Sequence, residues 1–536
     1  MCNQTMRDVY EATTLKEKSL SAAGYRVVSM WQCEWEELKR NDEQLQNLIQ
    51  SFDLVPRLQP RDAFYGGRTN AVKLHHQVED GEKLHYLDFT SLYPWTNKNC
   101  LYPMGHPKII SQPEGTDISR YFGLVKCKIL PPFGLYHPVL PHRSGGKLTF
   151  PLCRTCVETE QPKPLTGRSH HCVHSEQERC LVGTWPTPEL QEAINRGYVI
   201  QYVYEIWHFS RNSNDLFSSY VNTFLKIKQE ASGWPDWVGD DATKRQQYIT
   251  DYLTHEGIQL EADKIQKNPG RRSLAKMMLN SFWGKYGQQG KKSQVEAIST
   301  PARLHTLLND DSREIQTLRV MSDEMIELVY KHVHDEEKVQ VNINIFVACF
   351  TTCWARLKLY REGLSRLQPQ QVLYFDTDSI IFSHREGQPM PPLGDHLGEF
   401  TSELKPGTHI VEFVSAGPKN YGYRTSDGKV ECKVRGFTLN TRGQAQLNFE
   451  LLKENVVNEV TELHEEPRVI HVHNPHKIQR NVQTKTLETV EETNRYKVVF
   501  DKRVVDPDTF LSYLYGYTRA ILDDTDMVNV NNLLEM

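Results

Sequence analysis

The sequence contains no run of about 18 apolar residues, which is the length that a membrane-spanning helix requires. Its first residues, MCNQTMRDVYEATTLKEK, also lack the apolar core of a secretory signal. These two absences predict an intracellular chain that neither crosses a membrane nor is secreted. The eleven cysteines are odd in number and unevenly spread, which favours reduced thiols over a disulfide framework.

A basic excess is also missing. Lys and Arg total 63 and Asp and Glu total 68, which gives a formal net charge of −5. No overall positive field therefore points to nucleic acid, although acidic metal ligands and surface acids can mask a local basic groove. With 536 residues, 38% of them hydrophobic, and no internal repeat, the chain is long enough for several domains or one large multi-lobed enzyme.

Two aspartates interrupt an apolar stretch at residues 372–382, VLYFDTDSIIF. Its flanks alternate too little for a half-exposed strand, so we expect a hairpin of two buried strands with DTD at the turn. Asp376 and Asp378 would share a face in extended geometry. Two carboxylates beside an apolar sheet repel each other and are costly to desolvate, and a bound Mg²⁺ would relieve both costs. The alternative is a solvent-exposed turn, in which aspartate is common.

A second aspartate stands in a similar setting in the segment LHYLDFTSLYPW. Asp88 follows an apolar strand, expected within residues 83–94, and precedes a turn. Two strand-end aspartates, Asp88 and Asp378, can meet across a sheet. Such a pair can hold two metal ions roughly 3.5–4 Å apart, the clamp used for in-line phosphoryl transfer.

Apolar residues with helical spacing occur in three stretches, at residues 214–231, 271–287 and 341–360. In the second stretch, Arg272, Lys276 and Asn280 lie four residues apart and therefore on one face. Lys and Arg suit the oxygens of a triphosphate. The alternative is a solvated basic face on an ordinary helix.

Five short segments resemble, in this order, the motifs of a known enzyme family. FYGGR resembles the Y-x-G-G loop of protein-primed family B DNA polymerases, and DFTSLYP, KMMLNSFWG and YFDTDS resemble motifs A, B and C of that family. GPKNY resembles the K-x-Y motif that follows motif C. Two insertions occupy the places of the terminal-protein and strand-displacement regions of the protein-primed branch. PLCRTC, GTW, MWQCEW and GGRTNA look most like the Polinton/Maverick type of these organellar and viral type B polymerases.

The resemblance implies an α+β right-hand polymerase fold, with a palm built on an antiparallel sheet, helical fingers, a thumb and two insertions. The implied regions are a remnant N-terminal region (1–53), palm entry with motif A (54–105), a Cys/His-containing insertion (106–205), fingers with motif B (206–287), a second insertion (288–340), palm with motif C and K-x-Y (341–438), and thumb with C-terminal region (439–536). No D-x-E strand precedes residue 60, so the exonuclease domain is missing, and we expect either a fragment of a longer polymerase or one without proofreading.

The resemblance also implies a role for each motif residue. Asp88 and Asp378 would be the catalytic carboxylates that bind two Mg²⁺ ions, with Asp376 as a supporting acid. The residues implied to bind the incoming nucleotide are Ser91, Leu92, Tyr93, Lys228, Lys276 and Asn280. The residues implied to contact primer-template DNA are Gly66, Gly67, Arg68, Tyr374, Thr377, Lys419 and Tyr421. Tyr93 would lie under the sugar and exclude a 2′-hydroxyl, which makes the substrate a deoxynucleotide.

The implied activity is DNA-directed DNA polymerisation in the replication of a mobile element or virus-like DNA, in the nucleus or wherever that DNA is copied. The implied partners are primer-template DNA, dNTPs and a terminal protein that serves as primer. Two other functions remain open: an inactive remnant that only binds primer-template DNA, and a metal-dependent nuclease. Phe64 and Trp283 depart from the resemblance, because the Y-x-G-G loop and motif B usually have tyrosine at these positions.

A cysteine- and histidine-rich segment lies in the first insertion. Cys153 and Cys156 form a C-x2-C pair, and Cys172 and His174 follow as C-x-H after fifteen intervening residues. This spacing is plausible for tetrahedral zinc in a structural role. The alternative is a reduced, cysteine-rich loop without metal.

Overall fold

A computed structural model describes residues 5–46, 55–159, 172–288, 293–332, 343–437, 439, 441–461, 468–481 and 486–518. The chain divides into two compact units, Met1–Arg57 and Leu58–Met536. Within the described ranges, no helix is both long enough and apolar enough to cross a membrane. The ten cysteines in these ranges are free thiols, in agreement with the prediction from the cysteine pattern.

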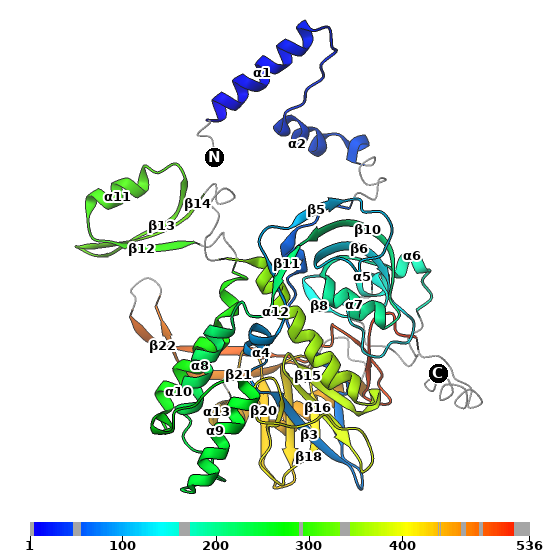
Figure 1. Cartoon of the computed structure of the whole chain (residues 1–536), viewed down its shortest axis with the longest axis vertical. Helices are drawn as coiled ribbons and strands as arrows, with labels where there is room; N and C mark the ends of the chain where they lie inside the picture. Colours follow the sequence, from blue (N-terminus) through cyan, green and yellow to red (C-terminus); the bar gives the residue numbers. More distant parts are fainter. Residues whose placement is uncertain are drawn as a thin grey trace. The chain divides into compact units, whose positions relative to one another are not determined.

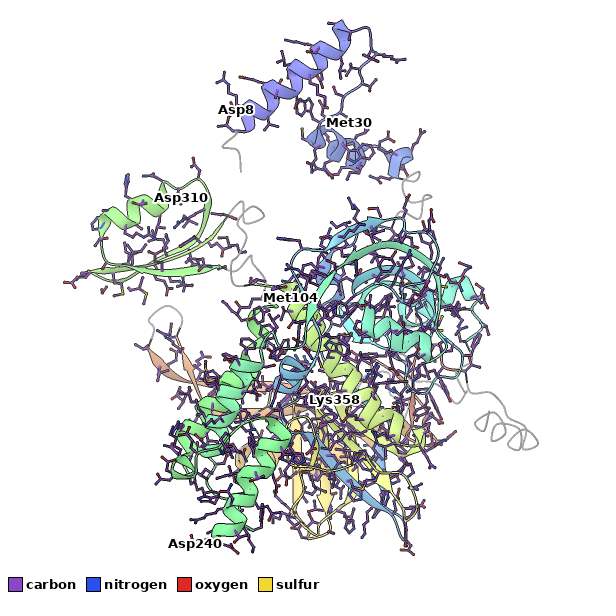
Figure 2. The ribbon with its side chains drawn as sticks, viewed as in Figure 1. Asp8, Met30, Met104, Asp240, Asp310 and Lys358 are labelled. Atoms are coloured by element: carbon purple, nitrogen blue, oxygen red, sulfur yellow. The ribbon has the colours of Figure 1, made fainter. Side chains whose placement is uncertain are left out.

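The first unit contains two helices, α1 (Met6–Ala22) and α2 (Gln32–Asn41). Thr5 and Asp8 form a capping box at the start of α1, with bonds of 3.2 Å and 2.7 Å between each backbone N–H and the other side chain. α2 buries none of its residues. Figure 2 labels Asp8 and Met30 within this region.

The second unit is built on a nine-stranded antiparallel sheet, seen in the lower part of Figure 1. Seven strands follow the order β1-β15-β16-β3-β18-β19-β20, while β17 pairs with β3 and β2 pairs with β18. The strands are β1 (Thr69–Ala71), β2 (His75–Gln77), β3 (Lys83–Phe89), β15 (Val372–Asp376), β16 (Ser379–His384), β17 (Phe400–Ser402), β18 (Ile410–Ser415), β19 (Asn420–Thr425) and β20 (Val430–Val434). Strands that are remote in sequence are thus neighbours in the sheet, and the hairpin expected at residues 372–382 is confirmed.

Both faces of this sheet are buried. Leu87, Phe89 and Phe375 belong to one core cluster with side chains of α12 (Ile345–Lys358). Lys358, labelled in Figure 2, ends α12 with its Nζ 5.3 Å from the centre of the Phe89 ring. On the other face, Tyr86 and Tyr374 belong to a second cluster with side chains of α14 (Phe449–Thr461).

The first insertion forms a four-stranded sheet in the order β5-β10-β6-β9. Its apolar side chains join the core cluster of α12. The elements of this region are β4 (Tyr102–Met104), β5 (Lys108–Ser111), β6 (Gly123–Leu130), β7 (His142–Ser144), β8 (Lys147–Thr149), α5 (Arg154–Thr159), α6 (Glu176–Arg179), β9 (Leu181–Pro186), α7 (Thr187–Asn195), β10 (Val199–His208) and β11 (Arg211–Ser213).

A group of helices follows the insertion: α8 (Ser218–Glu230), α9 (Ala242–Glu256) and α10 (Pro269–Ser281), with α4 (Leu92–Asn99) directly after β3. α8 begins later than the apolar pattern predicts, because Phe217 is its N-cap and Leu216 is 40% exposed. α10 begins at Pro269, capped by Asn268, and ends at Ser281 rather than near residue 287. The short helical turns are η1 (Pro60–Ala63), η2 (Ala262–Lys264), η3 (Trp283–Lys285), η4 (Leu359–Gly363), η5 (Leu364–Arg366) and η6 (Pro369–Gln371).

The second insertion is a small three-stranded sheet with one helix. Its elements are β12 (Gln294–Ile298), α11 (Pro301–Leu308), β13 (Arg313–Ser322) and β14 (Met325–His332). Ile298, Leu307, Leu328 and Tyr330 form its own core, and Asp310 marks it in Figure 2.

The C-terminal region packs on the large sheet. Its elements are α13 (Thr441–Gln446), α14, β21 (Ile470–Arg480), β22 (Leu487–Tyr496), β23 (Val504–Val505) and β24 (Ser512–Tyr513). Leu452, Val456 and Tyr496 belong to the same core cluster as the large sheet, and β21 and β22 form a long hairpin.

Candidate functional site

The turn of the β15–β16 hairpin carries two of the acidic residues. Asp376 faces Ser379 in the register, so Thr377 and Asp378 form a two-residue turn. Thr377 has a φ of 59°, which is unusual for a β-branched residue. Its N–H donates to the carbonyl oxygen of Arg68 at 2.8 Å, and the loop before β1 thereby holds the turn in this conformation.

Asp88 lies beside this turn on the neighbouring strand β3. It faces Ser379 in the register of β3 and β16, and the N–H of Phe89 donates to the carbonyl oxygen of Asp378 at 2.7 Å. The sheet thus brings together Asp88 and Asp378, which are far apart in sequence, at the end where both strands stop.

The carboxylate of Asp376 is already neutralised. The Nζ of Lys419 lies 2.9 Å from one of its oxygens. The hydroxyls of Thr69 and Thr377 donate to the other at 2.9 Å and 3.0 Å. Asp376 is therefore placed to hold the turn and Lys419 rather than to supply a vacant ligand.

Asp88 and Asp378 have no such partner. No ion pair in the described part of the chain involves either carboxylate. Burial, followed by the Asp378 carboxylate, raises the pKa of Asp88 to about 8. Burial, followed by the Asp376 carboxylate, raises the pKa of Asp378 to about 6, and Glu403 acts on both in the same direction. Two half-buried acids without an ion-pair partner among the described residues fit a hard divalent cation such as Mg²⁺, which would relieve both the repulsion and the desolvation.

Cations gather on the helical side of this site. The Nζ of Lys228, on α8, donates to the hydroxyl of Ser91 at 3.3 Å, and Ser91 caps α4 with a φ of 54°. Burial, followed by the charges of Arg272 and Lys276, lowers the pKa of Lys228 to about 8. Lys276 also acts on the carboxylate of Asp88. Mutually repelling cations opposite the acids favour binding of a polyanion between the two groups.

The other residues expected to bind the incoming nucleotide differ in how far they are exposed to solvent. Tyr93 is half-buried and stacks on Trp283, with ring centres 4.5 Å apart. Asn280 is exposed on the same helix as Lys276. Leu92 is 1% exposed and belongs to the core, so only its backbone could meet a ligand.

Three of the residues expected to contact DNA are buried in the structure, and their contact with DNA stays a prediction. Arg68 is 2% exposed, and its guanidinium donates to the carbonyl oxygens of Pro138 and Val139. Tyr374, 1% exposed, accepts a hydrogen bond from the N–H of Lys419 at 2.8 Å. These side chains position the loop before β1 and the Lys419 turn.

Tyr421 is the third. It is 5% exposed, and its hydroxyl lies 2.9 Å from that of Tyr86 within the core. Lys419, Thr377, Gly66 and Gly67 are at least partly exposed and remain able to meet a ligand.

Glu403 and Lys433 belong to the site but to no motif. Glu403 directly follows β17, and its N–H donates to the carbonyl oxygen of Tyr86 at 3.0 Å. Lys433, on β20, has its Nζ 5.3 Å from the centre of the Tyr86 ring and lowers the pKa of Asp88 against the dominant burial. Only the strand order brings them here, and no signal in the sequence indicates it.

The four predicted zinc ligands are also brought together. The Nδ1 of His174 lies 3.5, 3.3 and 3.6 Å from the Sγ atoms of Cys153, Cys156 and Cys172. The Sγ atoms of Cys156 and Cys172 are 3.7 Å apart. Tetrahedral zinc, with Zn–S about 2.3 Å and Zn–N about 2.0 Å, requires separations of about 3.5–3.8 Å. The four side chains therefore form a cluster with the geometry of a structural zinc site.

Comparison with known proteins agrees with the motif pattern. Residues 59–248 match the family model described as DNA polymerase type B, organellar and viral. A probable DNA polymerase of Podospora anserina is 24% identical over 368 residues, covering 64% of this chain and 24% of that protein. A DNA polymerase of Kluyveromyces lactis is 22% identical over 389 residues, covering 69% of this chain and 31% of that protein. The chain spans 24% and 31% of the length of these two relatives.

Solved structures of Phi29 DNA polymerase are also similar. The complex with single-stranded DNA has a TM-score of 0.47 at 15% identity, covering 85% of this chain and 66% of that chain. The complex with primer-template DNA and incoming nucleotide has a TM-score of 0.47 at 15% identity, covering 89% and 74%. By the family match and the two curated relatives, the chain is similar to the organellar and viral type B DNA polymerases.

Proposed function

We propose that the chain is a DNA-directed DNA polymerase that adds deoxynucleotides to the 3′ end of a primer. The observation that carries this proposal is the register of β3 and β16, which sets Asp88 beside Asp378. The cations of α8 and α10 face these acids. The names of the curated relatives support the same activity.

Asp88 and Asp378 would hold two Mg²⁺ ions. Bound there, the ions would make the primer 3′-hydroxyl a better nucleophile and stabilise the charge that develops on the leaving pyrophosphate. Lys228 and Lys276 would contact the triphosphate oxygens and add to that stabilisation. The backbone from Ser91 would contact the same group.

The base and sugar would be held by residues of α4 and α10. Tyr93, held in place by its stack on Trp283, would lie under the sugar and exclude a 2′-hydroxyl. Asn280 would face the incoming nucleotide. Since base pairing reads the template, the protein needs only shape and phosphate contacts. Gly66, Gly67, Thr377 and Lys419 are the exposed candidates for them.

The regions fit the parts of a polymerase hand. The nine-stranded sheet would be the palm, α8 to α10 the fingers, and the chain after residue 439 the thumb and C-terminal region. The Y-x-G-G-like loop and the two insertions support protein-primed replication of a mobile element or virus-like DNA, with a terminal protein as partner.

Primer extension with Mg²⁺ and dNTPs on a defined primer-template tests the function. We expect template-directed addition to the primer 3′ end. Binding of primer-template without any addition would identify an inactive remnant. Degradation of the primer without addition would identify a nuclease.

Lys228→Met is expected to raise the KM for dNTP by about 10- to 100-fold, because a charge-assisted bond to the triphosphate is lost. Lys226→Met is the matched control. Lys226 lies on the same helix, two residues before Lys228, and its Nζ pairs with Glu261 at 2.6 Å. Single-nucleotide incorporation measured over a range of dNTP concentrations gives the KM for dNTP of each variant. Equal KM values for the two variants would remove Lys228 from the nucleotide site.

Gly67→Ala is expected to lower the rate of nucleotide addition on the order of 10²-fold. A Cβ on Gly67 would lie 2.5 Å from the hydroxyl of Thr377, so the aspartate turn would have to move, and displacement of about 1 Å costs this much. Gly270→Ala is the control, because its Cβ would make only an ordinary contact at 3.7 Å. Single-turnover rates at saturating DNA and dNTP test this, and equal rates would show that the turn tolerates the shift.

We also propose that Cys153, Cys156, Cys172 and His174 bind a structural zinc ion. Their separations fit tetrahedral coordination, and three of the four ligands are soft thiolates, which zinc favours. Metal analysis of the purified chain is expected to give one zinc per chain, and its absence would end the proposal.

A further inference from the structure

The C-terminal segment (residues 499–518) contacts both pieces of chain that supply the Cys/His ligands. The N–H of Leu152, next to Cys153, donates to the carbonyl oxygen of Tyr515 at 2.8 Å. The N–H of Cys172 donates to the hydroxyl of Thr518 at 3.3 Å. A metal ion that joins the two pieces would therefore also assemble the surface on which this segment lies.

The C-terminal segment also packs closely against the chain around Cys153. Gly516 has a φ of +84°, and a Cβ there would lie 2.5 Å from the backbone nitrogen of Cys153. Val504 and Tyr515 are buried in one apolar cluster with Cys153 and Cys156. The ligand cysteines are thus part of the packing that holds the segment.

The same segment is tied to the strand beside the catalytic hairpin. The N–H of Ser512 donates to the carbonyl oxygen of Val72 at 2.7 Å, and the N–H of Leu74 donates to that of Phe510 at 2.8 Å. The buried guanidinium of Arg503 donates to the carbonyl oxygen of Ser512 at 2.6 Å, which fixes the segment's own fold. Because β1 pairs with β15, the segment supports the edge of the sheet that carries Asp376.

The segment also supports the turn that carries Lys419. A Cβ on Gly417 would lie 2.6 Å from the carbonyl oxygen of Val499, so this turn packs directly on the segment. Lys419 itself has a φ of 64°. A small cavity at this junction is lined by Ala71, Gly417, Pro418, Val499 and Lys502, among others.

Lys502 adds a cation at this place. It is partly buried, and the charges that act on it come from Asp501, Asp376, Arg435 and Lys419. The cations Lys502, Arg435 and Lys419 outnumber the acids Asp501 and Asp376, and Lys419 is half-exposed. This place therefore suits the phosphate backbone of a nucleic acid.

We propose that zinc bound by the Cys/His cluster fastens the C-terminal segment to the sheet, and so places Lys502 and the Lys419 turn for binding the primer-template backbone. The inference rests on the proposed zinc site and polymerase function. Zinc would raise the affinity for DNA by positioning Lys502 and the Lys419 turn. It would leave the chemistry at Asp88 and Asp378 unchanged.

The test compares the full chain with zinc bound, after zinc removal by a chelator selective for zinc over magnesium, and after zinc is restored. Hydrogen exchange of residues 504–516 is expected to accelerate on removal and to recover on restoration. The Kd for primer-template is expected to rise about tenfold and the slope of log Kd against log salt to fall by about one, as for a lost phosphate contact. The single-turnover rate at saturating DNA is expected to stay within about twofold, since these contacts position DNA and do not touch the reacting atoms.

Two kinds of variant distinguish the loss of zinc from the loss of contact between the C-terminal segment and the sheet. Cys172→Ser is expected to reproduce the zinc-free state, whereas Cys180→Ala, in the same insertion but outside the cluster, is expected to keep zinc and affinity. Gly516→Ala is expected to keep zinc but lose DNA affinity. Gly428→Ala is its control, with a φ of +81° and nothing within 4 Å of the added Cβ.

Exchange of residues 504–516 that is unchanged by zinc removal would overturn the inference, and so would unchanged DNA affinity in Gly516→Ala. Exchange needs no catalysis. A chain that shows the exchange effect but never extends a primer would therefore refute the polymerase function and leave the zinc-dependent docking standing.

Discussion

Replacing Asp88 or Asp378 by asparagine is expected to lower the single-turnover rate of nucleotide addition on the order of 10³-fold. That is the scale of losing one preorganised group that faces the charge of a transition state. Asparagine keeps the shape of the side chain but removes the charge that would hold Mg²⁺. The Kd for primer-template is expected to be unchanged, because neither carboxylate would contact the DNA backbone.

The same variants make a second, opposite prediction for stability without added Mg²⁺. The folded chain raises the pKa of Asp88 to about 8, above the value of about 3.9 in an unfolded chain. Ionisation of Asp88 therefore costs folding stability, and the cost grows as pH rises from about 4 to about 8. Asp88→Asn removes this cost, so its Tm should exceed that of the unaltered chain by more at pH 8.5 than at pH 5.

A structural role for Asp88 predicts the reverse, with activity and Tm falling together. Asp395→Asn provides the control, because Asp395 is an exposed acid on the loop between β16 and β17. It is expected to change neither the rate nor the Tm. Extension that survives in Asp88→Asn would contradict the proposed metal site.

The sequence predicted the parts of the site whose signal is local. The apolar flanks of Asp376 and Asp378 specify two buried strands, and a two-residue turn between them follows from their spacing. The sequence showed only that Asp88 can lie beside this turn. Whether it does depends on the order of the strands in the sheet. That order places Glu403 and Lys433 at the site too, and neither lies in a recognisable motif.

The sequence did not predict that some motif residues expected at the DNA would be buried. Arg68 and Tyr421 have polar groups that suit DNA, but the sequence does not show which way a side chain points. Both find partners inside the protein, in the carbonyl oxygens of the insertion and in the hydroxyl of Tyr86. Buried polar groups must be hydrogen-bonded, so the insertion and the sheet decide these contacts.

Arg356→Met is expected to destabilise the second unit by about 3–5 kcal/mol, because it leaves the carboxylate of Glu189 buried without a counter-charge. Arg356, on α12, is 2% exposed, and its Nε and Nη2 each lie 2.7 Å from an oxygen of Glu189 on α7. Its Nη1 donates to the carbonyl oxygens of Tyr65 and Gly66 at 2.9 Å and 3.0 Å. One guanidinium therefore joins the insertion, the central helix and the loop before the catalytic sheet.

Guanidinium-induced unfolding of the full chain, followed by a signal from the second unit, measures this effect. Arg361→Met is the matched control: Arg361 pairs with Glu192 at 2.8 Å, but its side chain is 46% exposed, so a loss of at most about 1 kcal/mol is expected. The double variant Arg356→Met/Glu189→Leu should recover much of the stability, since it buries no lone charge. Activity should not recover with it, because Tyr65 and Gly66 still lack their donor. If activity does return, Arg356 acts on stability alone and the loop does not depend on it.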